Sequence, residues 1–366
     1  MNEVVAQKFK RLRDEMSAQN IDLVALGPTA HTQWLLGYSP YPDERMCLLL
    51  IGKENEAFVM PALNANAVRE HTDIEFFEWA DDQGPTAALE KALANVTGGA
   101  VKQVVLDETM RADFALNLLD KLDGAAHQFT KSTVGALRMR KTEAEYELLK
   151  LNAQIADEAQ AIAAKTARPG VTEREVAEAV KEHFMSKGAK PVFDIVGANE
   201  NGAFPHHHTS DRVLKSGDVV VVDIGGTTKG YPSDITRMVA VDTLRDDYQE
   251  VHDVVEAAVK AALAACKPGV KASDVDKAAR DVITEAGYGE FFSHRTGHGL
   301  GIEIHEEPYI SASSDVILDE GMVFSIEPGI YQPGKFGIRL EEIVYLRADG
   351  PEVLSERSRD IVISKD

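Results

Sequence analysis

Two aspartates near the middle of the chain stand where a metal ion could bind. The apolar run 219–222 is typical of a buried strand and is followed directly by Asp223. A carboxylate at the end of such a strand is costly to bury unless it is paired or bound to a metal. Glycines within residues 225–230 permit a tight reversal, and we expect the returning strand to place Asp234 opposite Asp223. Either aspartate alone would be interpreted as an ordinary turn or cap residue.

The segment HRTGHGLGIEIHE (294–306) carries three histidines interleaved with glycines. Glycine lets the backbone approach a site closely, so we expect His298 to be a metal ligand with His294 and His305 beside it. The spacing from His298 to His305 is too long for a single-turn HExxH zinc helix. The alternative is that these histidines are exposed or satisfied in the core, and the glycine spacing makes that alternative the weaker one.

Two glutamates follow in the segments FSIEPGIY and FGIRLEEIVY. Glu327 ends an apolar strand before a Pro-Gly turn, and Glu341 lies in an alternating strand. Alternation places Arg339 and Glu341 on the same side of that strand and Glu342 on the other side. Arg339 could orient a ligand carboxylate through a bidentate contact, or it could form an ordinary ion pair, and the sequence favours neither.

Consecutive histidines at 206–208 lie in the loop-like segment NGAFPHHHTSD. Such tracts are usually solvated. One of the three side chains could supply a proton donor to a nearby site, and the sequence pattern alone does not say which.

The second part of the chain contains a weak internal duplication. RPGVTEREVAEA (168–179) resembles KPGVKASDVDKA (267–278), with an offset of 268 − 169 = 99 residues. SGDVVVVDIGG resembles EGMVFSIEPGI, and there an offset of 327 − 223 = 104 aligns Asp223 with Glu327. Folding two like halves together would bring four carboxylates, which raise one another's pKa, towards one pseudo-twofold axis. Only cations would make that cluster tolerable, so the repeat itself predicts a metal site.

The length of the chain suggests two domains. Residues 1–135 alternate helix and strand signals, which favours an α/β layer domain. The expected helices there are 4–19, 87–94 and 112–122, and the expected strands are 21–26, 46–51, 57–60 and 103–106. In residues 136–366, Thr142 and Glu145 form a capping box that is expected to open a helix running to about Thr166.

Composition excludes several classes of function. A net charge of −21 argues against nucleic acid and against an anionic membrane surface, because phosphate binding needs basic clusters. Cysteine occurs only as Cys47 and Cys266, which excludes a disulfide scaffold and favours buried thiols in a reducing compartment. The charged amino-terminal segment lacks a signal-like apolar region, and no apolar run reaches 18 residues. We therefore expect a cytoplasmic protein.

The last two thirds of the chain resemble the pita-bread metallopeptidases, the group of methionine aminopeptidase, aminopeptidase P and prolidase. The matching motifs are the D-x10-D pair at Asp223 and Asp234, TGHGLGIEIHE, SIEPGIY and RLEE. With its further amino-terminal domain, the full chain resembles the proline-specific branch, the Xaa-Pro aminopeptidases and Xaa-Pro dipeptidases. This resemblance implies an α+β fold, in which a catalytic domain of duplicated helices and antiparallel sheet follows a smaller α/β creatinase-like domain.

The resemblance also implies a dinuclear metal site and roles for individual residues. The implied metal ligands are Asp223, Asp234, His298, Glu327 and Glu341. Hard ligands of this kind favour manganese, with cobalt, zinc or iron as competitors. A water shared by two such ions loses its proton near neutral pH and would attack the scissile carbonyl. The implied catalytic residues are Glu327, His206 and His305, and the implied substrate-binding residues are His206, His294, His305 and Arg339.

Three hypotheses about function follow. The leading one is a metal-dependent exopeptidase that cleaves short Xaa-Pro peptides as a homodimer, either as a dipeptidase or as an aminopeptidase. A second is a hydrolase or lyase of the same fold that acts on a small osmolyte, as ectoine hydrolases do. A third is a non-catalytic binding module, which predicts lost ligands, whereas all five ligand positions are present here.

Overall fold

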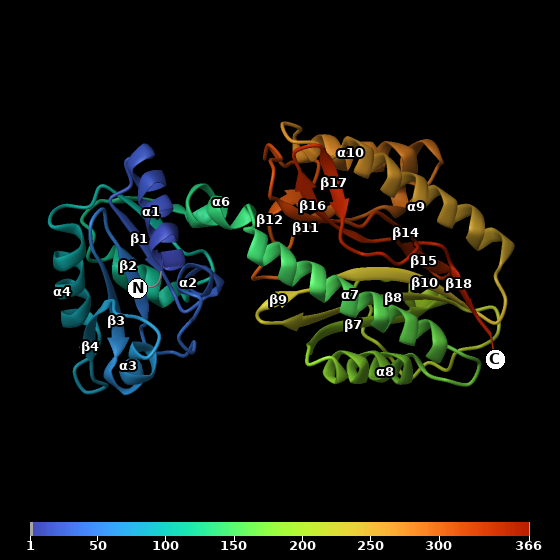
Figure 1. The fold of residues 1–366 in the computed structure, drawn as a ribbon, viewed down its shortest axis with the longest axis horizontal. Coiled ribbons are helices and arrows are strands. Elements are labelled where there is room, and N and C mark those ends of the chain that lie inside the picture. Colours follow the sequence, from blue (N-terminus) through green and yellow to red (C-terminus); the bar gives the residue numbers. More distant parts are fainter. Residues whose placement is uncertain (1–2, 366) are drawn as a thin grey trace. The chain divides into compact units, whose positions relative to one another are not determined.

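The computed structural model describes residues 3–365, which form two compact units. Unit 1 ends at Arg138, and unit 2 begins at Met139. Figure 1 traces both along the chain from blue to red. Each unit has its own sheets and its own hydrophobic core.

Unit 1 is built around a six-stranded sheet with the strand order β4-β3-β2-β1-β5-β6. β1 pairs with β2 in antiparallel and with β5 in parallel fashion, so the sheet is mixed. The strands are β1 (Leu23–Leu26), β2 (Leu48–Ile51), β3 (Glu56–Pro61), β4 (Glu75–Trp79), β5 (Gln103–Leu106) and β6 (Ala126–Phe129). The helices are α1 (Glu3–Ala18), α2 (Ala30–Leu36), α3 (Ala62–Arg69), α4 (Thr86–Thr97), α5 (Ala112–Leu119), the 3₁₀ turn η1 (Thr130–Ser132) and α6 (Val134–Met139).

The α/β architecture predicted for the first part of the chain is confirmed. The predicted strand 103–106 has the bounds of β5, and the other predicted elements differ from the observed ones by a few residues at their ends. The predicted elements do not include α2, α3, β4, β6 or α6. α2 spans seven residues, too few to show a helical period, and β6 is largely exposed and lacks the alternation of a half-buried strand.

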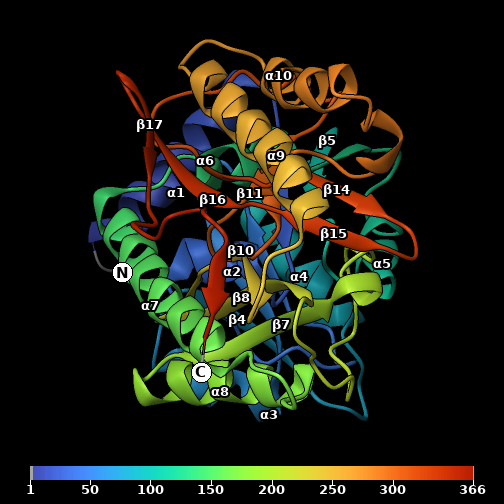
Figure 2. The same ribbon diagram turned by 90° about the vertical axis from the view of Figure 1, so that its right-hand side faces the viewer.

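Unit 2 carries two pairs of helices on opposite sides of its strands, as Figures 1 and 2 show from two directions. The helices are α7 (Glu143–Thr166), α8 (Glu173–Ser186), α9 (Asp246–Ala265) and α10 (Ala272–Glu285), with 3₁₀ turns η2 (Asn199–Asn201) and η3 (Gly289–Phe291). The capping box predicted at the start of α7 is present, since Thr142 N donates to Glu145 Oε2 over 2.8 Å and Glu145 N donates to Thr142 Oγ1. α7 also ends where the sequence predicts.

Three sheets lie between the helix pairs of unit 2. The first has the order β18-β10-β8-β7, the second has the order β12-β11-β13-β16-β17, and β14 and β15 form a separate hairpin. The strands of the first sheet are β7 (Lys190–Ala198), β8 (Val219–Thr228), its short partner β9 (Tyr231–Pro232), β10 (Ile235–Val241) and β18 (Val362–Ser364). The others are β11 (Gly297–Gly299), β12 (Glu306–Ile310), β13 (Val323–Ile326), β14 (Gly329–Gln332), β15 (Phe336–Arg339), β16 (Glu342–Arg347) and β17 (Gly350–Val353).

The internal duplication is visible in the hydrogen bonds of unit 2. In the first half, Leu214 N donates to Val171 O over 2.8 Å, and in the second half Leu318 N donates to Val270 O over 2.8 Å. The glycine before each of the two valines has a positive φ, 92° in one half and 89° in the other. The offsets, 270 − 171 = 99 and 318 − 214 = 104, are those of the sequence repeat. The same backbone contact therefore precedes β8 in the first half and β13 in the second half.

No helix within residues 3–365 is both long and apolar enough to cross a membrane. Cys47 and Cys266 are buried and free, as their contexts predict. Burial raises the pKa of each thiol to about 12, so neither is suited to act as a nucleophile near neutral pH.

Candidate metal centre

The aspartate pair comes from one hairpin. Asp223 lies within β8, and Asp234 lies in the short link between β9 and β10. The hairpin turns at Lys229 and Gly230, whose φ angles are 51° and 82°, and this turn fixes the register. Thr236 is the cross-strand partner of Asp223, so the expectation that Asp234 stands directly opposite Asp223 is wrong. Asp234 is two residues from Thr236 and faces the same side, so both aspartates still converge.

Gly225 and Gly226 remain within β8 and take no part in the turn, contrary to expectation. A Cβ atom at Gly225 would lie 2.2 Å from the ring of Phe193, and one at Gly226 would lie 2.4 Å from the ring of Phe184. The two glycines therefore make room for aromatic side chains beside Asp223. A glycine cluster in a sequence does not distinguish this close packing from a turn.

The second half contributes one histidine and two glutamates. His298 is the middle residue of β11, Glu327 follows β13 directly, and Glu341 lies between β15 and β16. The pairing of β11 with β12 shifts its register at His298, an irregularity that re-aims a side chain. His298 Nε2 lies 3.2 Å from Glu327 Oε1 and 3.6 Å from Asp234 Oδ2. The five predicted ligands and His305 form three overlapping groups of three residues. In each group, one ligand atom from every residue lies within 4.8 Å of the other two. The groups are Asp234, His298 and His305; His298, Glu327 and Glu341; and Asp223, Asp234 and Glu341.

Three carboxylates, those of Asp223, Asp234 and Glu341, are buried against one another. Burial raises the pKa of Asp234 well above its ordinary value, and the negative charges of Glu341 and Asp223 add to this effect. Burial and the charges of Glu327 and Asp223 likewise raise the pKa of Glu341. Asp223 Oδ1 and Glu341 Oε1 are buried with no hydrogen-bond partner among residues 3–365. Buried oxygens in such a cluster require a proton or a cation.

Glu327 differs from the other carboxylates because a histidine faces it. Burial opposes its ionisation, but the hydrogen bond and charge of His298 together with the charges of His294 and Arg339 outweigh burial and lower the pKa of Glu327 to about 2. Ser325 Oγ donates to Glu327 Oε1 over 3.0 Å and accepts from the backbone N of His298. These contacts fix the position of the Glu327 carboxylate, which is the candidate acceptor for the proton of an attacking water.

Arg339 is a buried cation inside the cluster. Its Nη2 atom donates to Asp223 Oδ2, its Nε atom donates to Thr236 Oγ1 over 3.1 Å, and its Nη1 atom donates to Tyr331 OH over 2.7 Å. Thr236 Oγ1 in turn donates to Glu341 Oε2 over 2.8 Å. The contact with Asp223 uses one nitrogen instead of the two of a bidentate pair, because the others serve neighbouring groups. This geometry matches the orienting role, since Arg339 steers two of the carboxylates.

Two histidines of the second half stand beside the carboxylates. His294 Nε2 lies 2.9 Å from Tyr331 OH, which is also the partner of Arg339. The ring of His305 meets the ring of His298 edge to face, with centroids 4.1 Å apart. Partial burial and the neighbouring His298 lower the pKa of His305 to about 4, so its imidazole is neutral near pH 7.

The histidine tract 206–208 belongs to a loop that a buried carboxylate anchors. His206 and His208 are exposed, whereas His207 Nε2 lies 3.0 Å from Glu173 Oε2. Glu173 is fully buried and also accepts from the backbone N of Ser210 over 3.1 Å. The loop is therefore fixed through His207, and all three histidines of the tract, His206 among them, line the cavity.

A cavity of about 740 Å³ opens onto these residues. Its polar lining includes Asp223, Asp234, His298, Glu327, Arg339, His206, His294 and His305. Its apolar lining includes Val192, Phe193, Ile195, Pro205 and Ile304. Glu341 lies behind the polar lining and is 1% exposed. The sequence does not predict the apolar part, because its residues come from segments far apart in the chain.

Comparison with known proteins identifies the family to which this site belongs. The family profile described as "Metallopeptidase family M24" matches residues 147–348, and the profile "Creatinase/Prolidase N-terminal domain" matches residues 8–141. The chain belongs to metallopeptidase family M24. Membership implies that this M24 chain binds divalent metal. The resemblance to the pita-bread metallopeptidases and the predicted two-domain α+β fold are confirmed.

Similarity to individual M24 proteins extends over nearly the whole chain. A protein of Mycobacterium tuberculosis named "Probable dipeptidase PepE" is 38% identical over 337 residues, which cover 90% of this chain and 88% of that protein. The "Xaa-Pro dipeptidase" of Pyrococcus horikoshii is 31% identical over 364 residues, 98% of this chain and 100% of that protein. The crystal structure of dipeptidase PepE from Mycobacterium ulcerans matches with a TM-score of 0.94 at 34% identity, covering 98% of both chains.

The sequence analysis does not identify three side chains that hydrogen-bond to residues of this M24 site. They are Tyr331, Thr236 and Ser325. Tyr331 and Ser325 stand inside the motif SIEPGIY, so the motif itself is the signal that could have found them. Thr236 acts through its cross-strand position and through its bonds to Arg339 and Glu341. Such a role depends on strand register, which the sequence does not fix.

Proposed function

We propose that this chain is a metal-dependent Xaa-Pro peptidase that binds two divalent ions and prefers Xaa-Pro dipeptides. Family membership supports the metal dependence. The names of similar proteins support the dipeptide preference, because the P. horikoshii relative is named Xaa-Pro dipeptidase and the mycobacterial relatives are named dipeptidases. A homodimer, which the family resemblance implies, is part of the same proposal and can be tested by the molar mass in solution.

The buried carboxylate cluster is the observation that carries the proposal. One oxygen from each of Asp223, Asp234 and Glu341 lies within 4.8 Å of the others, and two oxygens of the cluster are buried with no hydrogen-bond partner in the described part of the chain. Four carboxylates and one imidazole are a hard donor set that suits manganese, with cobalt, zinc or iron as competitors. The residues present therefore fit a pair of divalent ions. The proposed ligands are Asp223, Asp234, His298, Glu327 and Glu341.

Each side chain of the site has a task in the proposed hydrolysis. When bound, the two metal ions would lower the pKa of a water molecule and polarise the scissile carbonyl. Glu327 takes the proton of the attacking water, and its contacts with His298 and Ser325 hold its carboxylate in place. His206 and His305 donate to the carbonyl oxygen as negative charge develops on it.

Two further residues act mainly on their neighbours. Arg339 keeps Asp223 oriented through the Nη2 contact. His294 lines the cavity and is tied to Arg339 through Tyr331, so it holds one side of the substrate pocket in place. A site of this kind depends on such contacts behind its ligands to keep its groups in the productive geometry.

The cavity supports an exopeptidase acting before proline. A free substrate amine is attracted by the acidic part of the site. The apolar lining formed by residues such as Val192, Ile195 and Ile304 offers a surface for the prolyl ring and for the side chain before it. The combination of an acidic end and an apolar lining fits a short peptide with a free amino terminus.

Hydrolysis of matched peptides tests this function. With Mn²⁺ restored, we expect kcat/KM for Ala-Pro to exceed kcat/KM for Ala-Pro-Ala and for Ala-Ala by at least about tenfold, a difference of ~1.4 kcal/mol in transition-state binding. Preference for Ala-Pro-Ala would overturn the dipeptide assignment in favour of an aminopeptidase. Failure on both proline peptides would overturn the Xaa-Pro assignment.

A further inference from the structure

A second buried ion pair lies directly behind the candidate metal centre. Arg237 follows Thr236 in β10, and Glu342 follows Glu341 at the start of β16. Because successive side chains of a strand point to opposite faces, Thr236 and Glu341 face the carboxylate cluster while Arg237 and Glu342 face away from it. Arg237 Nη2 lies 2.9 Å from Glu342 Oε1, and each side chain is 2% exposed. We call Arg237, Glu342, Ser355 and Arg359 the Arg237 network.

Arg237 holds the backbone of a proposed ligand as well as the carboxylate beside it. Its Nη1 atom donates to the carbonyl oxygens of Thr236 and Glu341, and Glu341 N donates to Thr236 O over 3.4 Å. β10, the second strand of the hairpin that carries Asp223 and Asp234, is thereby tied to the segment that carries Glu341. One guanidinium therefore joins the two halves of unit 2 at the residues that face the metal site.

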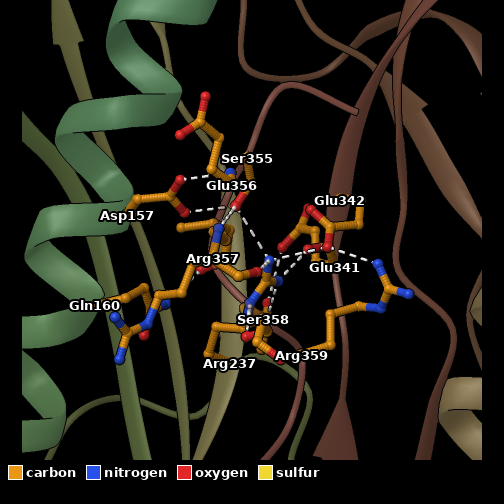
Figure 3. A network of polar contacts seen from close by, with 12 residues as sticks. Asp157, Gln160, Arg237, Glu341, Glu342, Ser355, Glu356, Arg357, Ser358 and Arg359 are labelled. Carbon is orange, nitrogen blue, oxygen red and sulfur yellow. Dashed lines mark hydrogen bonds and ion pairs between the residues drawn. The ribbon is translucent and has the colours of Figure 1, made fainter. Parts of the chain in front are cut away.

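The carboxy-terminal segment and two helices complete the Arg237 network, and Figure 3 shows its contacts with Glu342, the carboxy-terminal segment and Asp157. Arg237 Nη2 donates to Ser355 Oγ over 3.1 Å, and Ser355 Oγ donates to Asp157 on α7. Arg359 Nη1 donates to Glu342 Oε1 over 2.9 Å, and its Nε atom donates to Glu256 on α9 over 2.7 Å. Because α7 belongs to the first half and α9 to the second, the network fastens both helix pairs to the back of the site.

This arrangement matters because the cluster on the other face repels itself. Asp223, Asp234 and Glu341 have to be held together before any cation arrives, and Arg339 balances only part of their charge. A rigid frame behind the strands holds the carboxylates together during folding. The free energy needed to overcome their repulsion therefore does not reduce the affinity for metal. Without the frame, Glu341 and the hairpin could separate, and each ion would first have to draw them together.

We propose that Arg237 and Glu342 are positioning residues that set the affinity of the centre for its metal ions. This inference rests on the proposed function, since it presupposes that the carboxylate cluster binds metal. Groups that orient metal ligands from behind typically change metal affinity by about 10–100-fold when they are replaced. Neither residue is placed to touch substrate or metal. Replacing either one is therefore expected to change the Kd for metal ions and not the rate of the chemical step.

Titration of the full-length, metal-stripped chain with Mn²⁺ by isothermal calorimetry tests this inference. We expect Glu342→Gln and Arg237→Lys to raise the Kd for Mn²⁺ by about 10–100-fold. Lysine keeps the charge of Arg237 but cannot reach the carbonyls of Thr236 and Glu341 together. Glu342→Asp keeps the carboxylate and should show a smaller rise. At saturating Mn²⁺, kcat of the variants should return to within about threefold of wild type.

Asp218→Asn is the matched control. Asp218 is a buried carboxylate that accepts from Arg212 Nη1 over 2.6 Å, near the start of β8 and outside the proposed site. This variant should also melt lower than wild type, but its Kd for Mn²⁺ should be unchanged. The inference is overturned if Glu342→Gln melts lower and yet binds Mn²⁺ with the wild-type Kd. If Arg237→Lys does not fold, the two Glu342 variants decide. A wild-type chain that binds no Mn²⁺ overturns the metal site itself, a distinct result.

Discussion

Replacing Asp234 by asparagine is expected to abolish turnover while leaving the fold intact. Asp234 belongs both to the Asp223–Asp234–Glu341 cluster and to a cluster that contains His298, as Glu341 also does, so it is expected to contribute to binding both ions. The amide has the same shape but offers a neutral oxygen, which removes one negative charge from the ligand set. Losing ~4 kcal/mol of transition-state stabilisation lowers kcat by about 10³-fold. Hydrolysis of an Xaa-Pro dipeptide at saturating Mn²⁺ measures this change.

The metal-free form of the same variant gives an independent check. In that form, burial and the neighbouring carboxylates raise the pKa of Asp234 above its value in the unfolded chain. An acid whose pKa is raised by folding opposes folding at pH values above its unfolded pKa. Asparagine removes this penalty, so metal-free Asp234→Asn should melt no lower than metal-free wild type. Asp218→Asn should keep normal turnover, and normal turnover in Asp234→Asn would contradict the assigned role.

Removing metal from the wild-type chain should have an effect of similar size. We expect dialysis against a chelator to lower kcat/KM by about 10³-fold or more, because the acidified water and the polarised carbonyl are both lost. Binding of an ion at 100 times its Kd stabilises the folded state by ~2.7 kcal/mol. Its removal should therefore lower the melting temperature of unit 2 by about 5–10 °C.

Adding back Mn²⁺ should restore both activity and melting temperature, whereas adding Mg²⁺ at the same concentration should restore less. Mg²⁺ sheds its waters reluctantly and demands near-ideal octahedral geometry, so a compact carboxylate cluster suits it poorly. Full activity in a chain from which the metal has been stripped would contradict metal dependence. The control is a mock-dialysed sample carried through the same steps.

Elements with strong local signals could be predicted from the sequence. The capping box at Thr142 and Glu145 fixes the start of α7, because both of its hydrogen bonds form between residues three apart. The Pro-Gly-Val repeat marked two equivalent turns, and the same backbone hydrogen bonds are found in each. Side chains with metal-ligand chemistry also stand out through local motifs, since Asp223 and Glu327 follow apolar runs and His298 lies among glycines.

Features that depend on register or on distant segments could not be predicted. The sequence predicts Asp234 opposite Asp223, but the turn at Lys229 and Gly230 makes Thr236 the partner instead. Glu342 could be assigned to the far face of its strand, yet its partner Arg237 lies 105 residues earlier in the chain. The Arg237–Glu342 pairing follows from how two sheets meet, which no local pattern encodes.

Counting the bound metal decides whether the buried carboxylates form a dinuclear centre. The chain would be reconstituted with Mn²⁺, freed of excess metal by gel filtration, and analysed for metal and protein by mass spectrometry with inductively coupled plasma. We expect two equivalents of Mn²⁺ per wild-type chain and at most one in Asp234→Asn. A wild-type chain that retains no divalent metal, yet hydrolyses Xaa-Pro dipeptides at its full rate, would contradict the mechanism proposed here.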